Sequence, residues 1–316
     1  MFSLERPLGL DPMLFSLAPQ NPEEPFIPTA HYASSLVGCL REHYFRWTGA
    51  PITNPFKLIQ RQKMEAGDDD AVTFRRRLSE NARYHGLAIL DERAEIPIVG
   101  HVPELTYPIR GRADVVLDVF YEGHKERWLV EFKSVAGRGA KKLVGYHSKE
   151  GWVEGDLNEY PAYLAQVWAY ARFFEEQIDH IYLIAWDRES RLHQTYELRV
   201  QNGYLWWSPV PRVFPSPNDP LRPKWKRAPF TWEEIIARLQ MLEDYVSKKE
   251  LPPRFDPLTG KVYAAEIKNG RLFRVEDDEK TIGWKCAGYC EYADLCWLGK
   301  EVVNGDTSDS VTGDGW

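Results

Sequence analysis

A carboxylate and an ammonium group stand two residues apart in the segment WLVEFKS, at 128–134. Because successive side chains of a β-strand point to opposite faces, Glu131 and Lys133 share one face. If residues 122–123 form a two-residue hairpin loop, residues whose numbers sum to 245 lie opposite each other, which places Asp114 across from Glu131. Paired carboxylates hold Mg²⁺ or Mn²⁺, which neutralises phosphate and generates hydroxide from water, and Lys133 would orient that water or stabilise developing charge. The alternative is an ordinary cross-strand salt bridge.

The four cysteines of the chain form a one-plus-three pattern. Cys39 stands alone, whereas Cys286, Cys290 and Cys296 are clustered near the other end. Four thiolates are the usual complement of a [4Fe–4S] cluster. Zinc is the alternative metal, although structural zinc sites generally use two closely spaced pairs, and two disulfides are a third interpretation, typical of small secreted proteins. A site that closes almost the whole chain into a loop would clamp its ends together, so we expect a structural cluster.

Hydrophobic spacing predicts the elements that carry these residues. Regular structure is expected to begin near His31. The predicted elements are a short helix within 32–47 that carries Cys39, a helix from about Asp70 to Tyr84, a hairpin of strands 112–121 and 128–133, a helix over 157–177, strands at 180–187 and 196–200, an irregular proline-rich excursion over 208–229, and a helix that a Thr231–Glu234 capping box begins.

The motifs GRAD at 111–114 and EFK at 131–133 resemble those of the PD-(D/E)XK superfamily, and within it the RecB-like nucleases. The resemblance implies an α/β fold, a restriction-endonuclease-like core with a central mixed sheet flanked by helices. These nucleases carry a Q-x-x-x-Y motif on the helix after the catalytic strands, and Gln166 and Tyr170 match it at i, i+4, where they would contact substrate or brace the site. The family also uses an upstream helical metal ligand. Asp70 is the expected ligand beside the two carboxylates, and His85 is its competitor.

The cysteine pattern is similar to that of the CRISPR-associated adaptation exonucleases and of the iron–sulfur nuclease subunits of bacterial helicase–nuclease complexes. SSLVGCLR at 34–41 and KCAGYCEYADLC at 285–296 match the two ends of that layout. The likeness spans about residues 31 to 298. It implies an N-terminal arm over 1–30, a nuclease domain over 31–300 whose helical iron–sulfur lobe is built from about 31–60 and 230–300, and a disordered acidic tail over 301–316.

Composition limits how such a protein would meet a nucleic acid. The chain has 316 residues, 43% of them hydrophobic, which is enough for a large core. Its net charge of −7 gives no overall attraction to a polyanion, so DNA contact requires a local basic groove. Candidate groups that would track phosphates and stack bases, or else form a solvated face, are Arg75, Arg76, Arg77, Arg138, Lys141, Lys142, Tyr146 and Trp152.

The expected function is that of a metal-dependent DNA exonuclease acting on single strands or free ends, because the proteins it resembles are exonucleases. A helicase or recombination protein is the expected partner, since no phosphate-binding loop for a motor is present. Without an export signal or a long apolar run, we expect a cytoplasmic protein with no membrane contact. The rival functions are a non-catalytic DNA-binding or assembly subunit and, less consistent with the motifs, an iron–sulfur electron carrier.

Overall fold

A computed structural model describes residues 27–55, 58–82, 87–210, 224–278 and 280–299. Its centre is an eight-stranded sheet in the order β1-β3-β4-β7-β8-β9-β10, with β2 paired to β3. The β1–β3 and β4–β7 pairs are parallel and the others antiparallel, so the sheet is mixed, as predicted. The strands are β1 (His31–Tyr32), β2 (Ala88–Gly100), β3 (Ile109–Tyr121), β4 (His124–Val135), β7 (His180–Asp187), β8 (His193–Gln201), β9 (Tyr204–Pro209) and β10 (Lys226–Arg227).

The β3–β4 hairpin turns through Glu122 and Gly123. Both residues have positive φ, 50° and 91°, as the tight hairpin turns that match strand twist require. Tyr121 pairs with His124, and the register continues to Val115 opposite Val130. The predicted two-residue loop and the sum-to-245 register are therefore confirmed.

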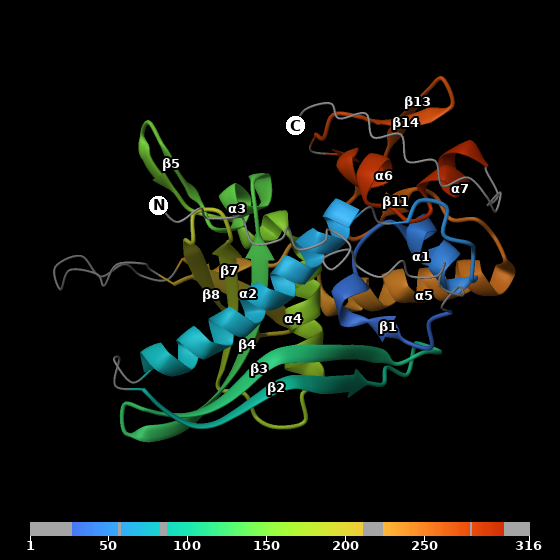
Figure 1. Ribbon diagram of the computed structural model, residues 1–316. Coiled ribbons are helices and arrows are strands. Elements are labelled where there is room, and N and C mark those ends of the chain that lie inside the picture. The colour runs from blue at the N-terminus through green and yellow to red at the C-terminus, as the bar shows by residue number, and fades with distance from the viewer. Residues whose placement is uncertain (1–26, 56–57, 83–86, 211–223, 279, 300–316) are drawn as a thin grey trace, which may run out of the picture.

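Helices cover both faces of this sheet (Figure 1). On one face α4 (Pro161–Phe173) is buried through its middle turns and packs with α5 (Trp232–Lys248) into the larger core. On the other face α2 (Leu58–Ala82) covers a smaller core, where the Phe74 ring stacks on Phe132 with centroids 4.6 Å apart. The chain thus folds as an α/β protein with a central sheet that helices flank on both faces.

Segments from the two ends of the described chain lie side by side (Figure 1). The capping box of Thr231 and Glu234 begins α5, as predicted, and α5 packs against α1 (Leu40–Trp47). The later elements are not only helical, because strands separate α5 from the last helices. These elements are β11 (Phe255–Asp256), β12 (Lys261–Tyr263), β13 (Ala265–Lys268), β14 (Arg271–Arg274), β15 (Thr281–Ile282), α6 (Trp284–Gly288) and α7 (Ala293–Leu298).

The helix predicted from Asp70 to Tyr84 differs most from the structure. It begins at Leu58, so Gly67 lies inside α2 and Asp70 lies near its middle rather than at its N-terminus. The remaining elements are η2 (Ala33–Ser35), α3 (Arg138–Leu143), β5 (Tyr146–Ser148), β6 (Gly151–Val153) and η4 (Leu157–Glu159).

Parts of four predictions fall outside the described residues: most of the arm at 1–30, His85, most of the proline-rich excursion and the tail at 301–316. None of the helices that the structure describes is both long and apolar enough to cross a membrane.

Candidate functional site

Asp114 lies where β3 and β4 separate. The paired register ends at Val115 opposite Val130, one residue before Asp114 and Glu131 would pair. The Asp114 carboxylate fills this gap, because its Oδ2 accepts a hydrogen bond from the Phe132 backbone N–H at 2.8 Å. Asp114 and Glu131 therefore lie beside each other at the fork of the two strands, as the sequence predicts.

Glu131 and Lys133 form a close ion pair at this fork. Lys133 Nζ lies 2.6 Å from Glu131 Oε1, and the Glu131 side chain is 1% exposed. The other oxygen, Glu131 Oε2, is buried and makes no hydrogen bond to any described residue. Burial raises the pKa of Glu131 to about 7 against the opposing effect of Lys133, and it also raises the pKa of Asp114. A buried carboxylate oxygen without a donor is costly, so this site has an unmet need for positive charge.

Gln166 and Tyr170 brace the fork from α4. Gln166 Nε2 donates to the Tyr170 hydroxyl at 2.7 Å, and that hydroxyl donates to the Arg112 carbonyl at 2.9 Å. Both side chains are buried. These contacts tie α4 to the β3 backbone two residues before Asp114, which is the geometry that a bracing role requires. Gly111 permits this approach, since a Cβ there would lie 2.5 Å from the Tyr170 ring.

A second tyrosine of α4 also reaches the site. Lys133 Nζ lies 5.2 Å from the centroid of the Tyr163 ring, which stacks on Tyr160. The ring therefore limits how far the ammonium group can move. In the sequence, the only signal for Tyr163 is its place about one turn before Gln166 on the same helix.

Asp70 is not brought to the two carboxylates. Its Oδ2 accepts a hydrogen bond from Ser134 Oγ at 2.6 Å, and Arg191 Nη1 lies 3.3 Å from its Oδ1. Ser134 follows Lys133, so it points to the face of β4 that α2 covers, away from Glu131. The expected ligand set of Asp70, Asp114 and Glu131 is therefore not assembled. Across the described ranges, no group of three or more His, Cys, Asp and Glu side chains is arranged to hold a metal ion.

Glu95 is an acidic residue beside Asp114 that sequence analysis missed. Ala94 pairs with Val115 and Ile96 with Ala113, so Glu95 lies opposite Asp114 across the β2–β3 ladder. Its φ of 56° is a left-handed conformation in the middle of a strand, which is strained for a residue with a side chain. Arg112 Nε lies 2.5 Å from its carboxylate and Arg75 Nη1 lies 3.7 Å away.

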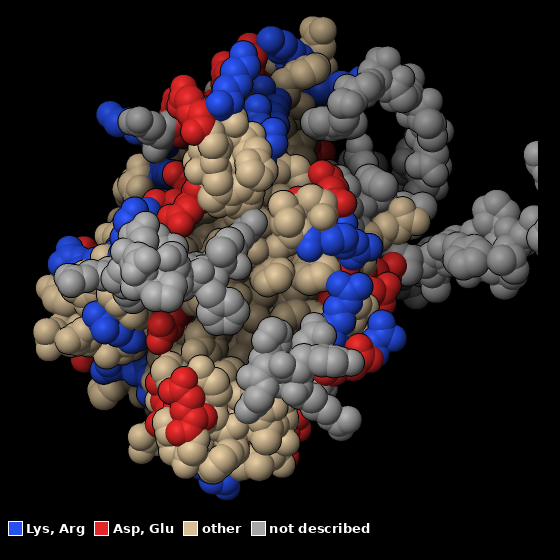
Figure 2. Space-filling model, turned by 90° about the vertical axis from the view of Figure 1, so that its left-hand side faces the viewer, with Lys and Arg blue, Asp and Glu red and all other residues tan. Residues whose placement is uncertain are grey.

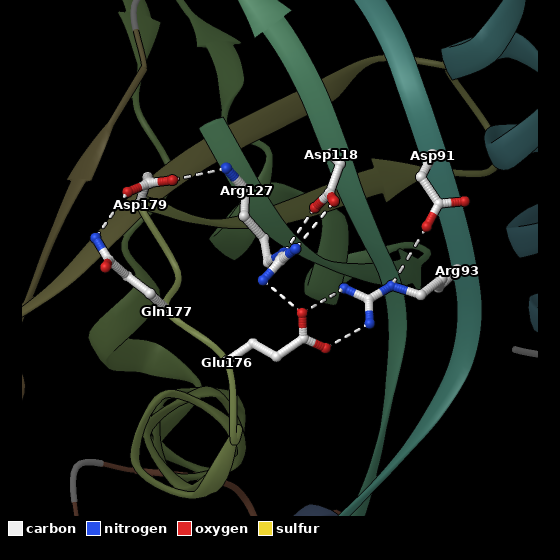
Figure 3. A network of polar contacts seen from close by, with 7 residues as sticks. All are labelled: Asp91, Arg93, Asp118, Arg127, Glu176, Gln177 and Asp179. Carbon is white, nitrogen blue, oxygen red and sulfur yellow. Dashed lines mark hydrogen bonds and ion pairs between the residues drawn. The ribbon is translucent and has the colours of Figure 1, made fainter. Parts of the chain in front are cut away.

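A different acidic group lies farther along the same hairpin and is already neutralised (Figure 3). Arg127 makes two hydrogen bonds to Asp118, at 2.6 and 2.9 Å, and both Arg127 and Arg93 lie 2.5 Å from Glu176. Asp179 accepts the Arg127 backbone N–H at 2.7 Å. These contacts tie the β3–β4 hairpin to the segment that follows α4. Because arginines satisfy these carboxylates, this network is structural and the unmet charge remains at Glu131.

The four cysteines line one pocket, which we call the cysteine pocket. Cys39 precedes α1, Cys286 lies in α6, Cys290 follows it, and Cys296 lies in α7. All four are free thiols, so the two-disulfide interpretation is wrong for this structure. The other residues of the pocket are Glu42, Phe45, Arg254, Tyr263, Lys285 and Trp297.

The donor set of this pocket fits a metal group. Burial raises the pKa of Cys39 to about 11 and that of Cys286 to about 12, so neither thiol ionises near neutral pH by itself. Thiolates are the form that binds metals, and a bound cation supplies the charge that stabilises them. Four sulfur donors from both ends of the described chain thus line one pocket, although among the described residues they are not arranged as ligands of a single metal ion.

The predicted basic groups do not form one continuous track. Arg75, Arg76 and Arg77 lie on α2, whereas Arg138, Lys141 and Lys142 lie on α3. Several of them have acidic or aromatic partners, as in the 2.7 Å contact between Lys142 and Glu159. Tyr146 and Trp152 lie on the β5–β6 hairpin. On the face shown in Figure 2, basic and acidic side chains are interspersed.

No family model matches the chain, and none of the curated proteins matches it. Among solved structures, one that is similar to this chain is the crystal structure of SSO0001, with 13% sequence identity and a TM-score of 0.39. The alignment covers 86% of this chain and 88% of that chain. This likeness is too weak to indicate a function.

Proposed function

We propose that this protein is a metal-dependent DNA nuclease of the PD-(D/E)XK class. The observation that carries the proposal is the buried, unpartnered Oε2 of Glu131 beside Asp114, with Lys133 on the other oxygen. A divalent cation such as Mg²⁺ or Mn²⁺ would satisfy this oxygen, because hard cations prefer carboxylate ligands. The resemblance of the GRAD and EFK motifs to RecB-like nucleases supports the same assignment.

Each residue then has a defined task. Asp114 and Glu131 would hold the cation. When bound, the cation would neutralise charge on the phosphate and make a water molecule easier to deprotonate into a nucleophile. Lys133 would hold the scissile phosphate or its attacking water in place, with its ammonium group confined by Glu131 and Tyr163. Tyr170 and Gln166 would keep the backbone at Asp114 in position. This is important because small displacements of reacting groups slow a reaction strongly.

The cysteine pocket is proposed to hold a [4Fe–4S] cluster with a structural role. Its support is the complete use of the cysteines in one cavity that both ends of the described chain line. Zinc is the other metal that four thiolates accept. Iron and acid-labile sulfide near four each per chain are expected after anaerobic purification. Stoichiometric zinc without iron would show that the pocket is a zinc site and not a cluster site.

DNA with single-stranded regions or free ends is the proposed substrate, and a helicase or recombination protein the proposed partner. Degradation of end-labelled single- and double-stranded DNA with Mg²⁺ or Mn²⁺ tests this. We expect Glu131→Gln and Lys133→Met to lose at least about 100-fold in rate, since each removes a group on the reacting phosphate or its metal. The exposed Glu154→Gln serves as control.

A readout without turnover separates binding from cutting. Mg²⁺ should raise the melting temperature of the wild-type chain and leave that of Glu131→Gln nearly unchanged, because the cation binds the folded state through this carboxylate. DNA binding without any metal-dependent cutting would instead identify a non-catalytic subunit. Equal rates for wild type and a folded Glu131→Gln variant would show that the proposed active site is wrong.

A further inference from the structure

One of the four cysteines of the cysteine pocket is less buried than the others. Cys39, Cys286 and Cys290 are buried, whereas Cys296 is partly exposed. It lies in α7, the last helix of the described chain. Cys296 is therefore the least buried of the four residues that would hold a metal group.

Arg254 is fixed over this sulfur by three contacts. Its Nε donates to Cys296 Sγ at 3.1 Å, and its Nη2 donates to the Cys296 carbonyl at 2.5 Å. The guanidinium carbon lies 3.7 Å from the centroid of the Trp297 ring. Two hydrogen bonds and a stacking contact fix the plane of the group, and a planar fork of this kind is a property of arginine that lysine lacks.

The charges around the pocket are arranged for an anion. Lys285 Nζ lies 2.5 Å from Glu42 Oε2, and both side chains line the pocket with Arg254. The lining thus carries two cations and one anion. A [4Fe–4S] core has fewer positive charges than its four thiolates have negative ones, so the assembled cluster is an anion. Donors to thiolate sulfur stabilise such a centre, and they stabilise its reduced form more because that form carries more negative charge.

We propose that Arg254 is a positioning residue for the cluster, which retains Cys296 as a ligand and raises the reduction potential of the cluster through its N–H···S hydrogen bond. The inference rests on the cluster of the proposed function. It goes beyond that function because it assigns the stability and potential of the centre to a residue outside the cysteine set. Arg254 reaches Cys296 from the loop before β11, so it also links that loop to α7.

The test uses the full-length chain, loaded with cluster under anaerobic conditions. Transfer of iron to a ferrous chelator and the reduction potential are measured for wild type, Arg254→Gln and Arg254→Lys, with the exposed Arg271→Gln on β14 as control. Loss of an outer partner of a metal ligand weakens metal retention roughly 10- to 100-fold, so we expect Arg254→Gln to release iron faster by that factor. Its potential should become more negative. Arg254→Lys should lie between wild type and Arg254→Gln, since it keeps the charge and loses the planar fork.

The outcomes separate this inference from the cluster itself. Wild-type iron retention and potential in Arg254→Gln would overturn the role of Arg254 while leaving the cluster in place. A wild-type chain that binds no iron would overturn the cluster and this inference together. If Arg254→Gln is insoluble, Arg254→Lys decides, and a wild-type potential and release rate in that variant would overturn the role of the planar guanidinium group of Arg254.

Discussion

The protonation of Glu131 links the candidate site to the stability of the whole chain. Its pKa is raised by burial from 4.5 to about 7, so between these values the folded chain keeps a proton that the unfolded chain has released. Stability must therefore fall as pH rises through this window. Without metal, the free energy of unfolding of the wild type should fall between pH 4.5 and 7 by at most about 3 kcal/mol more than that of Glu131→Gln.

Urea denaturation in chelator across this pH range measures the difference. The Glu154→Gln control should run parallel to wild type, because Glu154 is exposed. Parallel curves for wild type and Glu131→Gln would mean that Glu131 titrates like an ordinary carboxylate. Added Mg²⁺ should abolish the fall in wild type, since a cation replaces the missing positive charge.

At the scale of elements, the Tyr170 hydroxyl links α4 to the backbone of β3. Tyr170→Phe should destabilise the protein by about 1 to 2 kcal/mol, because the Arg112 carbonyl loses its donor and Gln166 loses its acceptor. Chemical denaturation measures this change. Tyr163→Phe is the matched control on the same helix, since it keeps the ring against Lys133. A cost for Tyr170→Phe no larger than that of the control would contradict the bracing role.

Another element-scale link joins α5 to the loop before Cys39. Arg238 and Asp256 have fully buried side chains 3.1 Å apart, and Gly38 donates to Asp256 and accepts from Arg238. Arg238→Met should cost about 3 to 5 kcal/mol, because it leaves a buried carboxylate uncompensated. Asp256→Leu in the same chain should recover part of this loss. If the double variant has a lower melting temperature than Arg238→Met, the two side chains contribute more to stability than mutual neutralisation of charge.

The elements show where sequence reasoning succeeds and where it stops. The β3–β4 register was predictable because a two-residue turn and strict alternation fix which residues face each other. The start of α2 was not predictable, since Gly67 and the acidic residues after it are typical of a helix N-terminus, whereas α2 begins at Leu58 and continues through them. That error misplaced Asp70, whose position depends on which face of β4 the helix covers.

At the scale of the whole molecule, cysteine variants and active-site variants should fail differently. Cys39→Ser or Cys290→Ser should lower the melting temperature of cluster-loaded protein, because metal binding to a site absent from the unfolded chain contributes directly to folding. Glu131→Gln should not lower it. Thermal melts of both classes in chelator test this. Cysteine variants that melt like wild type but lose nuclease activity would show that the cluster acts on DNA rather than as a clamp.

Contacts between distant segments explain most of what the sequence left undetermined. The one-plus-three cysteine pattern predicted a shared pocket, and the structure confirms that all four line one cavity. Neither Arg254 over Cys296 nor Glu95 opposite Asp114 was predictable, because each depends on how separate elements pack or pair in space. The spacing of residues in the sequence predicts which side chains are neighbours within one element. It does not predict which side chains another segment of the chain brings into contact with them.

The composition of the cysteine pocket also sets an order of events during synthesis. Cys39 leaves the ribosome well before the other three cysteines, so the pocket cannot exist until Cys296 has also been synthesised. About 250 residues separate Cys39 from Cys286, and at ~5–20 residues per second the first thiol waits on the order of tens of seconds for its companions. The central sheet, which precedes the late cysteines, can form during that interval. The pocket is therefore completed only after every strand of the sheet has been synthesised, and the proposed metal centre would enter a chain whose sheet has had time to form.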